Sequence, residues 1–157
     1  MTRGRAEPVR IGIVGLGNWG RLHAETLATL PGAQLAAVCD LDPARRSAVL
    51  EAIRAKAGAG MSGAPAMPVA FESFDACLRD ADLDALVIAT KDEQHAGHAV
   101  AALDRGWYVF VEKPLALTLT DARAVLTAAG RTGRAAVVGT ITSKWPALGR
   151  SSRCTSS

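Results

Sequence analysis

Short apolar runs alternate with amphipathic helical patterns along most of this 157-residue chain. The apolar runs predict strands, and the segments between them repeat apolar residues at intervals of three and four, the period of a helix with one buried face. The predicted strands are 11–16, 34–39, 69–71, 85–89, 107–111 and 135 to about 141. Strands that alternate with helices predict an α/β fold, a doubly wound parallel sheet covered by helices on both faces.

Five helices are predicted between these strands. Two are short or weakly patterned, 44 to about 57 and 74–79. The apolar faces of the other three are Trp19, Leu22, Leu27 and Leu30; Ala96, Ala99, Val100 and Leu103; and Ala122, Val125, Leu126 and Ala129. Residues 58–68 consist mainly of Gly, Ala, Pro, Ser and Met and are predicted to form a flexible surface connection.

The pattern predicts a single folded domain over residues 10–141. A loose polar arm, 1–9, precedes it. The tail, 142–157, contains five serines, three cations and no acid, with little periodicity, and is therefore predicted to be disordered.

Composition and charge exclude several functional classes. Apolar residues make up 49% of the chain and charged residues 21%, which is ordinary for a globular protein. Three of the 18 Lys and Arg residues lie in the tail, so the rest of the chain balances its 15 Asp and Glu residues. With no basic cluster and only 4% aromatic residues, we expect no nucleic-acid partner.

No apolar run approaches the roughly 18 residues of a membrane span, and no secretory signal follows the polar start of the chain. We therefore expect no membrane association and a cytoplasmic location. Cys39 and Cys77 lie in apolar settings without ligand spacing, so both are interpreted as reduced core residues.

The first predicted strand leads into Gly15, Gly17 and Gly20, which have G-x-G-x-x-G spacing and open a helical pattern. Gly15 allows the sharp turn, Gly17 lets the backbone approach a pyrophosphate, and Gly20 lets the helix pack closely on the strand. Free N–H groups at the helix start would face the phosphates. The motif predicts the dinucleotide-binding form of this sheet, the Rossmann fold.

Asp40 ends the second apolar run, twenty residues beyond Gly20. A carboxylate there can accept hydrogen bonds from an adenosine ribose and would repel a 2′-phosphate, which favours NAD. Alternatively, Asp40 or Asp42 caps the next helix. Arg45 and Arg46 could reach a 2′-phosphate, so NADP also stays open.

Polar groups follow each remaining long strand, namely Thr90, Glu112-Lys113 and Thr140. Because ligands of doubly wound sheets bind beyond the carboxyl ends of the strands, these groups are expected to converge on one edge. Pro114 disfavours helix at Lys113 and makes a cis peptide bond possible, which holds the lysine at the strand end.

The three histidines differ in their surroundings. His95 opens a helix and could face the cofactor cleft, or could be a surface or capping residue. His23 and His98 are interpreted as structural. No metal site is predicted, because the histidines have no Cys or carboxylate neighbours at ligand spacing.

Together these stretches resemble the N-terminal domain of the Gfo/Idh/MocA oxidoreductase family, relatives of glucose-fructose oxidoreductase and inositol dehydrogenase. The resemblance covers roughly residues 9–139. Its motifs are Ile-Gly-Ile-Val-Gly-Leu-Gly-Asn-Trp-Gly, Ala-Val-Cys-Asp, Leu-Val-Ile-Ala-Thr with His95 five residues on, and a run ending in Val-Phe-Val-Glu-Lys-Pro-Leu-Ala.

The resemblance implies NAD or NADP binding and hydride transfer to or from a sugar- or polyol-like alcohol. The implied cofactor-binding residues are Gly15, Gly17, Asn18, Trp19, Gly20, Asp40, Thr90, His95 and Glu112. Lys113 is the implied catalytic residue, hydrogen-bonding the reacting oxygen, where a cation stabilises developing alkoxide.

This chain departs from the family pattern in two places. Lys91 follows Thr90 where relatives usually have proline, and we expect the second, substrate-binding α/β domain of the family to be missing from this chain. We therefore expect a frameshift, a premature stop or a fragment after Val138. The alternative function is a truncated, non-catalytic dinucleotide-binding module. Relatives often associate through the second domain, so a homo-oligomer is possible.

Overall fold

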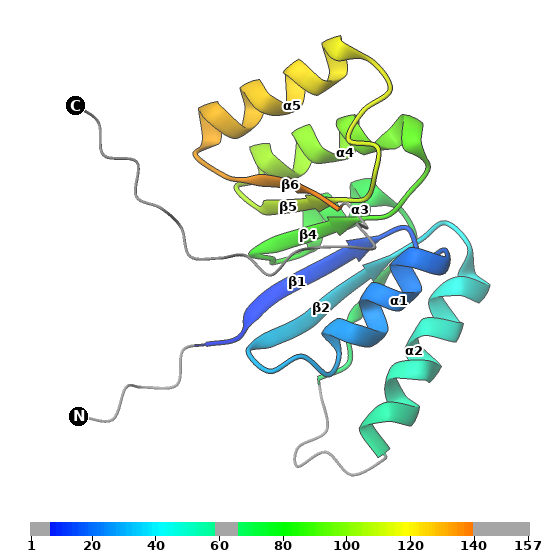
Figure 1. Ribbon diagram of the computed structural model, residues 1–157. Helices are drawn as coiled ribbons and strands as arrows, with labels where there is room; N and C mark the ends of the chain where they lie inside the picture. The colour runs from blue at the N-terminus through cyan, green and yellow to red at the C-terminus, as the bar shows by residue number, and fades with distance from the viewer. Residues whose placement is uncertain (1–6, 59–65, 140–157) are drawn as a thin grey trace, which may run out of the picture.

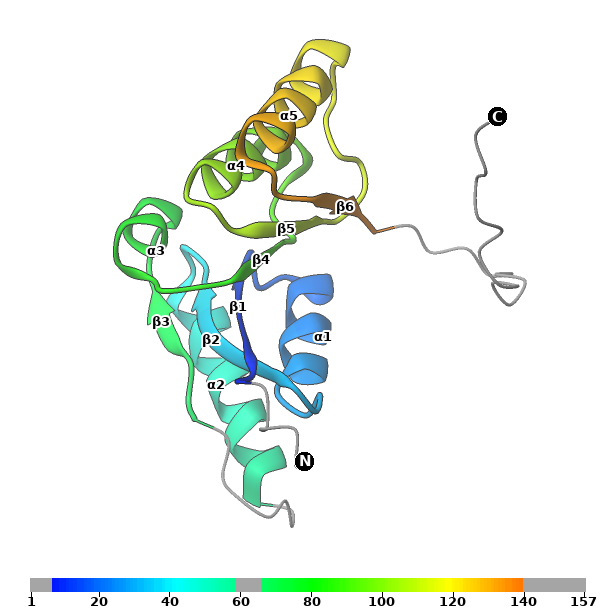
Figure 2. The same ribbon diagram turned by 90° about the vertical axis from the view of Figure 1, so that its left-hand side faces the viewer.

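The computed structural model describes residues 7–58 and 66–139. In this part of the chain, six parallel strands form one sheet in the order β3-β2-β1-β4-β5-β6. Figure 1 shows β2, β1, β4, β5 and β6 in this sequence across the sheet, and Figure 2 shows β3. This is the strand order of doubly wound dinucleotide-binding sheets. The predicted fold class is therefore confirmed. The tail, Thr140, most of the arm and most of the 58–68 connection lie outside the described residues, so the expectations for them remain predictions.

Strands and helices alternate along the chain without exception in the described part. The strands are β1 (Val9–Val14), β2 (Ala33–Cys39), β3 (Val69–Phe71), β4 (Ala85–Ile88), β5 (Tyr108–Val111) and β6 (Ala136–Val138). The helices are α1 (Asn18–Leu27), α2 (Pro43–Gly58), α3 (Phe74–Asp80), α4 (Asp92–Asp104) and α5 (Leu119–Thr132). Among the described residues no helix is both long enough and apolar enough to cross a membrane.

The helices divide between the two faces of the sheet (Figure 2). Helices α1 and α2 pack on one face, where Ala24, Val49 and Ile53 meet the strands in one apolar cluster. Helices α3, α4 and α5 cover the other face, around a second cluster that includes Cys77, Leu103 and Val125. Both faces of the central strands are therefore buried, which explains their continuous apolar runs.

Two predicted helix faces are partly wrong. In α1 the buried residues are Gly20 and Ala24, whereas Trp19 and Leu22 are about half exposed. In α5 the buried residues are Val125 and Ala128, and Leu126 is 66% exposed. In both helices an alanine, Ala24 or Ala128, occupies the buried face, and a pattern of large apolar residues does not reveal this.

The strands end level with one another. Val14 lies opposite both Cys39 and Ile88, and Ile88 lies opposite Val111. The outer strands continue the row, since Phe71 pairs with Cys39 and Val138 with Val111. The residues that follow each strand therefore lie along a single carboxyl edge of the sheet, as the sequence predicts.

Candidate functional site

The three glycines of the first turn occupy three different environments. Gly15 has φ of +86°, and a Cβ there would lie 2.5 Å from the carbonyl oxygen of Ala89. A Cβ at Gly20 would lie 1.7 Å from the carbonyl oxygen of Gly15. A Cβ at Gly17 would meet no atom within 4 Å. Two glycines thus close the turn, and the third leaves backbone open toward solvent.

Helix α1 begins directly after Gly17, and no side chain caps it. The N–H groups of a first helical turn have no partner within the helix, and the helix dipole makes this end positive. Since the fold supplies no side-chain acceptor, this end is suited to an anionic group such as a phosphate.

Asp40 stabilises the turn through both oxygens of its carboxylate. Oδ2 accepts a hydrogen bond from the N–H of Leu16 at 2.7 Å, and Oδ1 accepts one from the N–H of Asp42 at 2.9 Å. The Asp40 side chain is 9% exposed. Asp42, rather than Asp40, caps α2, because its Oδ1 accepts the N–H of Ala44 at 2.8 Å. The capping alternative for Asp40 is therefore wrong.

The two arginines that left NADP open make different contacts. Arg46 donates from Nη1 to the carbonyl oxygens of Asp40 and Leu41, at 2.6 and 3.2 Å. Arg45 lies 3.7 Å from Asp40 and 3.6 Å from Asp42, measured between guanidinium nitrogen and carboxylate oxygen. Arg46 is thus engaged with the backbone, whereas Arg45 remains about half exposed beside both carboxylates.

A cavity of about 540 Å³ opens beside the first turn, and we call it the glycine-turn cavity. It is lined by residues at the ends of β1 and β4, by the Asp40 loop, and by residues at α3 and α4. Its lining residues include Gly15, Gly17, Asp40, Asp42, Arg45, Ser73, Phe74, Thr90, Gln94 and His98.

A second cavity, of about 470 Å³, lies at the ends of β4 and β5, and we call it the lysine cavity. Its lining residues are Trp19, Ala89, Thr90, Asp92, His95, Glu112, Lys113 and Pro114. Ala89 and Thr90 line both cavities, so the two adjoin at the end of β4. Neither cavity is lined by Asn18 or Gly20.

Lys113 is exposed in the lysine cavity, and its bond to Pro114 is cis. Its neighbour Glu112 does not point to solvent. Instead, Glu112 Oε1 lies 2.7 Å from Nε2 of His23, which comes from α1 on one face of the sheet. His23 is interpreted from its sequence setting as structural, and this contact is not predicted, because the two residues are 89 positions apart and no local pattern joins them.

His95 lines the lysine cavity but is 1% exposed. Its Nδ1 lies 2.6 Å from the carbonyl oxygen of Pro114, and its Nε2 lies 3.1 Å from the carbonyl oxygen of Thr90. Both ring nitrogens therefore face backbone of the chain itself. His95 is not a surface residue, and it opens α4 from within the core.

His98, one turn further along α4, lies at the glycine-turn cavity. Its ring centroid is 4.0 Å from that of Phe74, and its Nδ1 is 3.4 Å from Oγ1 of Thr90. Burial lowers the pKa of His98 below its ordinary value, and the neighbouring His95 lowers it further. Burial likewise raises the pKa of Cys39 to about 12, so this thiol at the cavity wall stays protonated near neutral pH.

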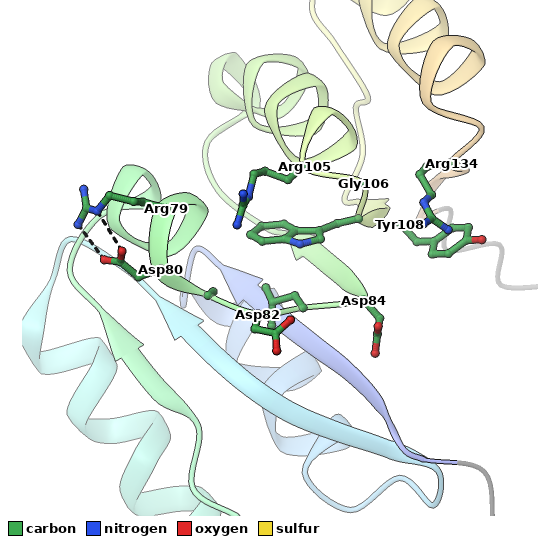
Figure 3. A pocket seen from close by; sticks show the side chains of 11 residues that line it. Arg79, Asp80, Asp82, Asp84, Arg105, Gly106, Tyr108 and Arg134 are labelled. Carbon is green, nitrogen blue, oxygen red and sulfur yellow. Dashed lines mark hydrogen bonds and ion pairs between the residues drawn. The ribbon is translucent and has the colours of Figure 1, made fainter.

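A third cavity, of about 440 Å³, lies at the opposite, amino edge of the sheet (Figure 3). There the guanidinium of Arg105 lies 5.7 Å from the centroid of the Trp107 ring, and that of Arg134 lies 4.8 Å from that of Tyr108. This cavity shares no residue with the other two. Among residues 7–58 and 66–139, no group of His, Cys, Asp or Glu could hold a metal ion.

The parallel sheet, the glycine turn and the paired cavities at the carboxyl edge define a domain of the dinucleotide-binding Rossmann class. The sequence model of the Gfo/Idh/MocA oxidoreductases, described as an oxidoreductase family with an NAD-binding Rossmann fold, matches residues 9–140. The chain belongs to this family. Both the family resemblance and the expected class of cofactor are thereby confirmed.

Individual relatives agree on the family but differ in their described activities. The chain is 36% identical over 129 residues to an inositol 2-dehydrogenase of Salmonella paratyphi B, covering 80% of this chain and 34% of that protein. It is 33% identical over 132 residues to a glycosyl hydrolase family 109 protein of a Shewanella species, covering 82% and 27%. The chain therefore spans about a third of the length of these curated relatives.

Solved structures of similar fold include the scyllo-inositol dehydrogenase of Lactobacillus casei, crystallised with bound NAD(H) and scyllo-inositol. The match has a TM-score of 0.73 and 27% sequence identity, and it covers 85% of this chain and 36% of that one.

Proposed function

We propose that this chain binds NAD across the carboxyl edge of its sheet, as the cofactor-binding part of an oxidoreductase. The observation that carries the proposal is the first turn. Gly15 and Gly20 are required by the fold, whereas Gly17 leaves open space at an uncapped helix start. A glycine that the chain itself does not need is explained by a ligand backbone or phosphate that approaches closely.

In this proposal the glycine-turn cavity holds the adenosine and pyrophosphate of the cofactor. Gly15, Gly17, Asn18 and Gly20 supply the turn and the helix start, and Asp40 faces the ribose. Its carboxylate is largely covered and already accepts two N–H groups, so its negative charge is fixed in place. A fixed negative charge disfavours a 2′-phosphate, which supports NAD over NADP.

Titration calorimetry with NADH and NADPH tests this proposal. The wild-type chain is expected to bind NADH in the micromolar range and NADPH at least tenfold more weakly. Asp40→Asn, which removes the charge, should reduce that preference. Asp42→Asn is the matched control, because asparagine caps a helix as well as aspartate does and the overall charge change is the same. A wild-type chain that is folded and binds neither dinucleotide would overturn the proposal.

The lysine cavity is proposed to hold the nicotinamide side, next to Thr90, His95, Trp19 and Glu112. When bound, the nicotinamide supplies hydride transfer. Lys113 is the exposed cation at this point, and its ammonium group can donate a hydrogen bond to the reacting oxygen of an alcohol and stabilise alkoxide character there. The relatives' described substrates support a polyol or sugar-like alcohol as the substrate class.

A turnover assay, together with the binding measurement, distinguishes an enzyme from a binding module. NADH formation from NAD with a panel of inositols and sugars, lost in Lys113→Met, would support the catalytic role. Binding of NADH without turnover of any member of the panel would support the alternative, a non-catalytic dinucleotide-binding module.

A cytoplasmic location is part of the proposal, supported by Cys39 and Cys77, which are both buried free thiols. Association with a second copy and the lack of a nucleic-acid partner remain predictions from the sequence.

A further inference from the structure

Two histidines from opposite faces of the sheet contact the two residues that flank Lys113. On one side, Nε2 of His23 in α1 lies 2.7 Å from Oε1 of Glu112. On the other side, Nδ1 of His95 in α4 lies 2.6 Å from the carbonyl oxygen of Pro114. Lys113 itself is exposed between these two contacts.

Both contacts are well shielded from water. The side chains of His23 and Glu112 are 27% and 13% exposed, and the His23 ring also packs edge-on against Phe110, with the centroids 5.4 Å apart. His95 is fully buried. Hydrogen bonds in such settings are stronger than exposed ones and expensive to leave unmade. The His23 contact therefore fixes the Glu112 side chain, and the His95 contact fixes the backbone at Pro114.

His95 also joins the two turns between which a nicotinamide ring would lie. Its second nitrogen, Nε2, lies 3.1 Å from the carbonyl oxygen of Thr90. The ring therefore lies between the end of β4 and the end of β5, and a neutral imidazole donates its one N–H to one of these two carbonyl oxygens. A residue that served only to fill the core would not need ring nitrogens that face the backbone of both turns.

We propose that His23 and His95 are positioning residues that brace the 112–114 turn from both faces of the sheet and thereby fix Lys113 in the lysine cavity. This inference rests on the proposed function, since it concerns the placement of Lys113 beside a nicotinamide. Neither histidine is assigned contact with the reacting atoms.

A double-mutant cycle on NADH affinity, measured by calorimetry, tests the brace. Lys113 lines the cavity proposed for the nicotinamide, so Lys113→Met is itself expected to weaken NADH binding. His23→Leu and His95→Leu should each weaken it about tenfold, because Lys113 is then no longer held in that cavity. In a Lys113→Met background, the same substitutions should change NADH affinity by less than about twofold. AMP, which carries no nicotinamide, should bind all of these variants as it binds the wild type.

Conservative variants of the two histidines should retain the NADH affinity that the leucine variants lose. Glutamine at 23 can place its amide nitrogen where Nε2 lies, and asparagine at 95 can place its amide nitrogen where Nδ1 lies. His23→Gln and His95→Asn should therefore retain most of the NADH affinity. If His95→Leu fails to fold, His95→Asn is compared with His95→Gln, which cannot reach Pro114 in the same way and should bind NADH more weakly.

Equal losses of NADH and AMP affinity, or additive losses in the Lys113→Met background, would overturn the brace and leave the histidines as ordinary core residues. A wild-type chain that binds AMP and NADH shows that such a failure concerns the brace alone. A wild-type chain that binds neither would instead contradict the proposed function.

Discussion

At the scale of single residues, the first turn shows that one residue type serves three physical purposes. Position 15 requires glycine because its φ is positive, and position 20 requires glycine because a Cβ would overlap the backbone. Neither reason applies to Gly17. The spacing of the motif predicts the three glycines from the sequence, because the turn that Gly15 and Gly20 form is local, although the Cβ contact that Gly15 avoids is with the distant Ala89.

Substitution by alanine should separate these purposes. Gly20→Ala is expected to destabilise the fold by about 3 kcal/mol, because its Cβ would overlap the Gly15 carbonyl oxygen. Gly17→Ala should change the free energy of unfolding by less than about 1 kcal/mol, since its φ of −66° suits alanine and its Cβ meets open space. Urea unfolding measures both, and similar losses in the two variants would contradict this account.

Other site residues could not be predicted locally. Asp40 and Lys113 follow apolar runs and are found by reading strand ends. The contacts of His23 with Glu112 and of His95 with Pro114 join residues 89 and 19 positions apart. Such contacts depend on which helix packs over which strand end, and that follows only from the completed fold.

At the scale of elements, the first five strands are predicted within about two residues, since buried parallel strands are apolar throughout and end at turns, whereas β6 ends at Val138, before the predicted end near 141. The helix faces are less predictable. In α1 and α5 the buried residues include Ala24 and Ala128, while Leu22 and Leu126 remain exposed. Close packing favours small residues on the buried face. A large apolar side chain that is exposed cannot be told from a buried one by the sequence pattern alone.

Packing between elements also sets a pH dependence. His98 joins α4 to Phe74 at the start of α3 and to Thr90 after β4. Its pKa is lowered by burial, so on acidification the unfolded chain binds a proton at this residue before the folded chain does. The contribution of neutral His98 to stability is therefore present above the ordinary histidine value and is lost as the pH falls below it.

Urea unfolding at about pH 7.5 and about pH 5.5, on either side of the ordinary histidine pKa, measures this effect. The wild-type chain should lose more stability on acidification than His98→Gln does, because the variant has no group to protonate at this position. Equal losses in the two proteins would show that His98 does not contribute.

At the scale of the whole molecule, the two edges of the sheet differ in character. The carboxyl edge carries the glycine-turn and lysine cavities, which adjoin at Ala89 and Thr90. The amino edge carries the third cavity, where Arg105 and Arg134 lie over aromatic rings. A doubly wound sheet binds its ligand beyond the carboxyl ends of its strands, so NADH is expected to bind at the carboxyl edge and not at the amino edge.

The most direct test of that commitment is an amide NMR titration of the 157-residue chain with NADH. The account predicts shifts at the carboxyl edge, at Gly15, Gly17, Asp40 and Lys113 above all, with the amides around Arg105 and Arg134 unmoved. Shifts that gather at the amino edge, or a folded chain whose spectrum NADH leaves unchanged, would contradict it.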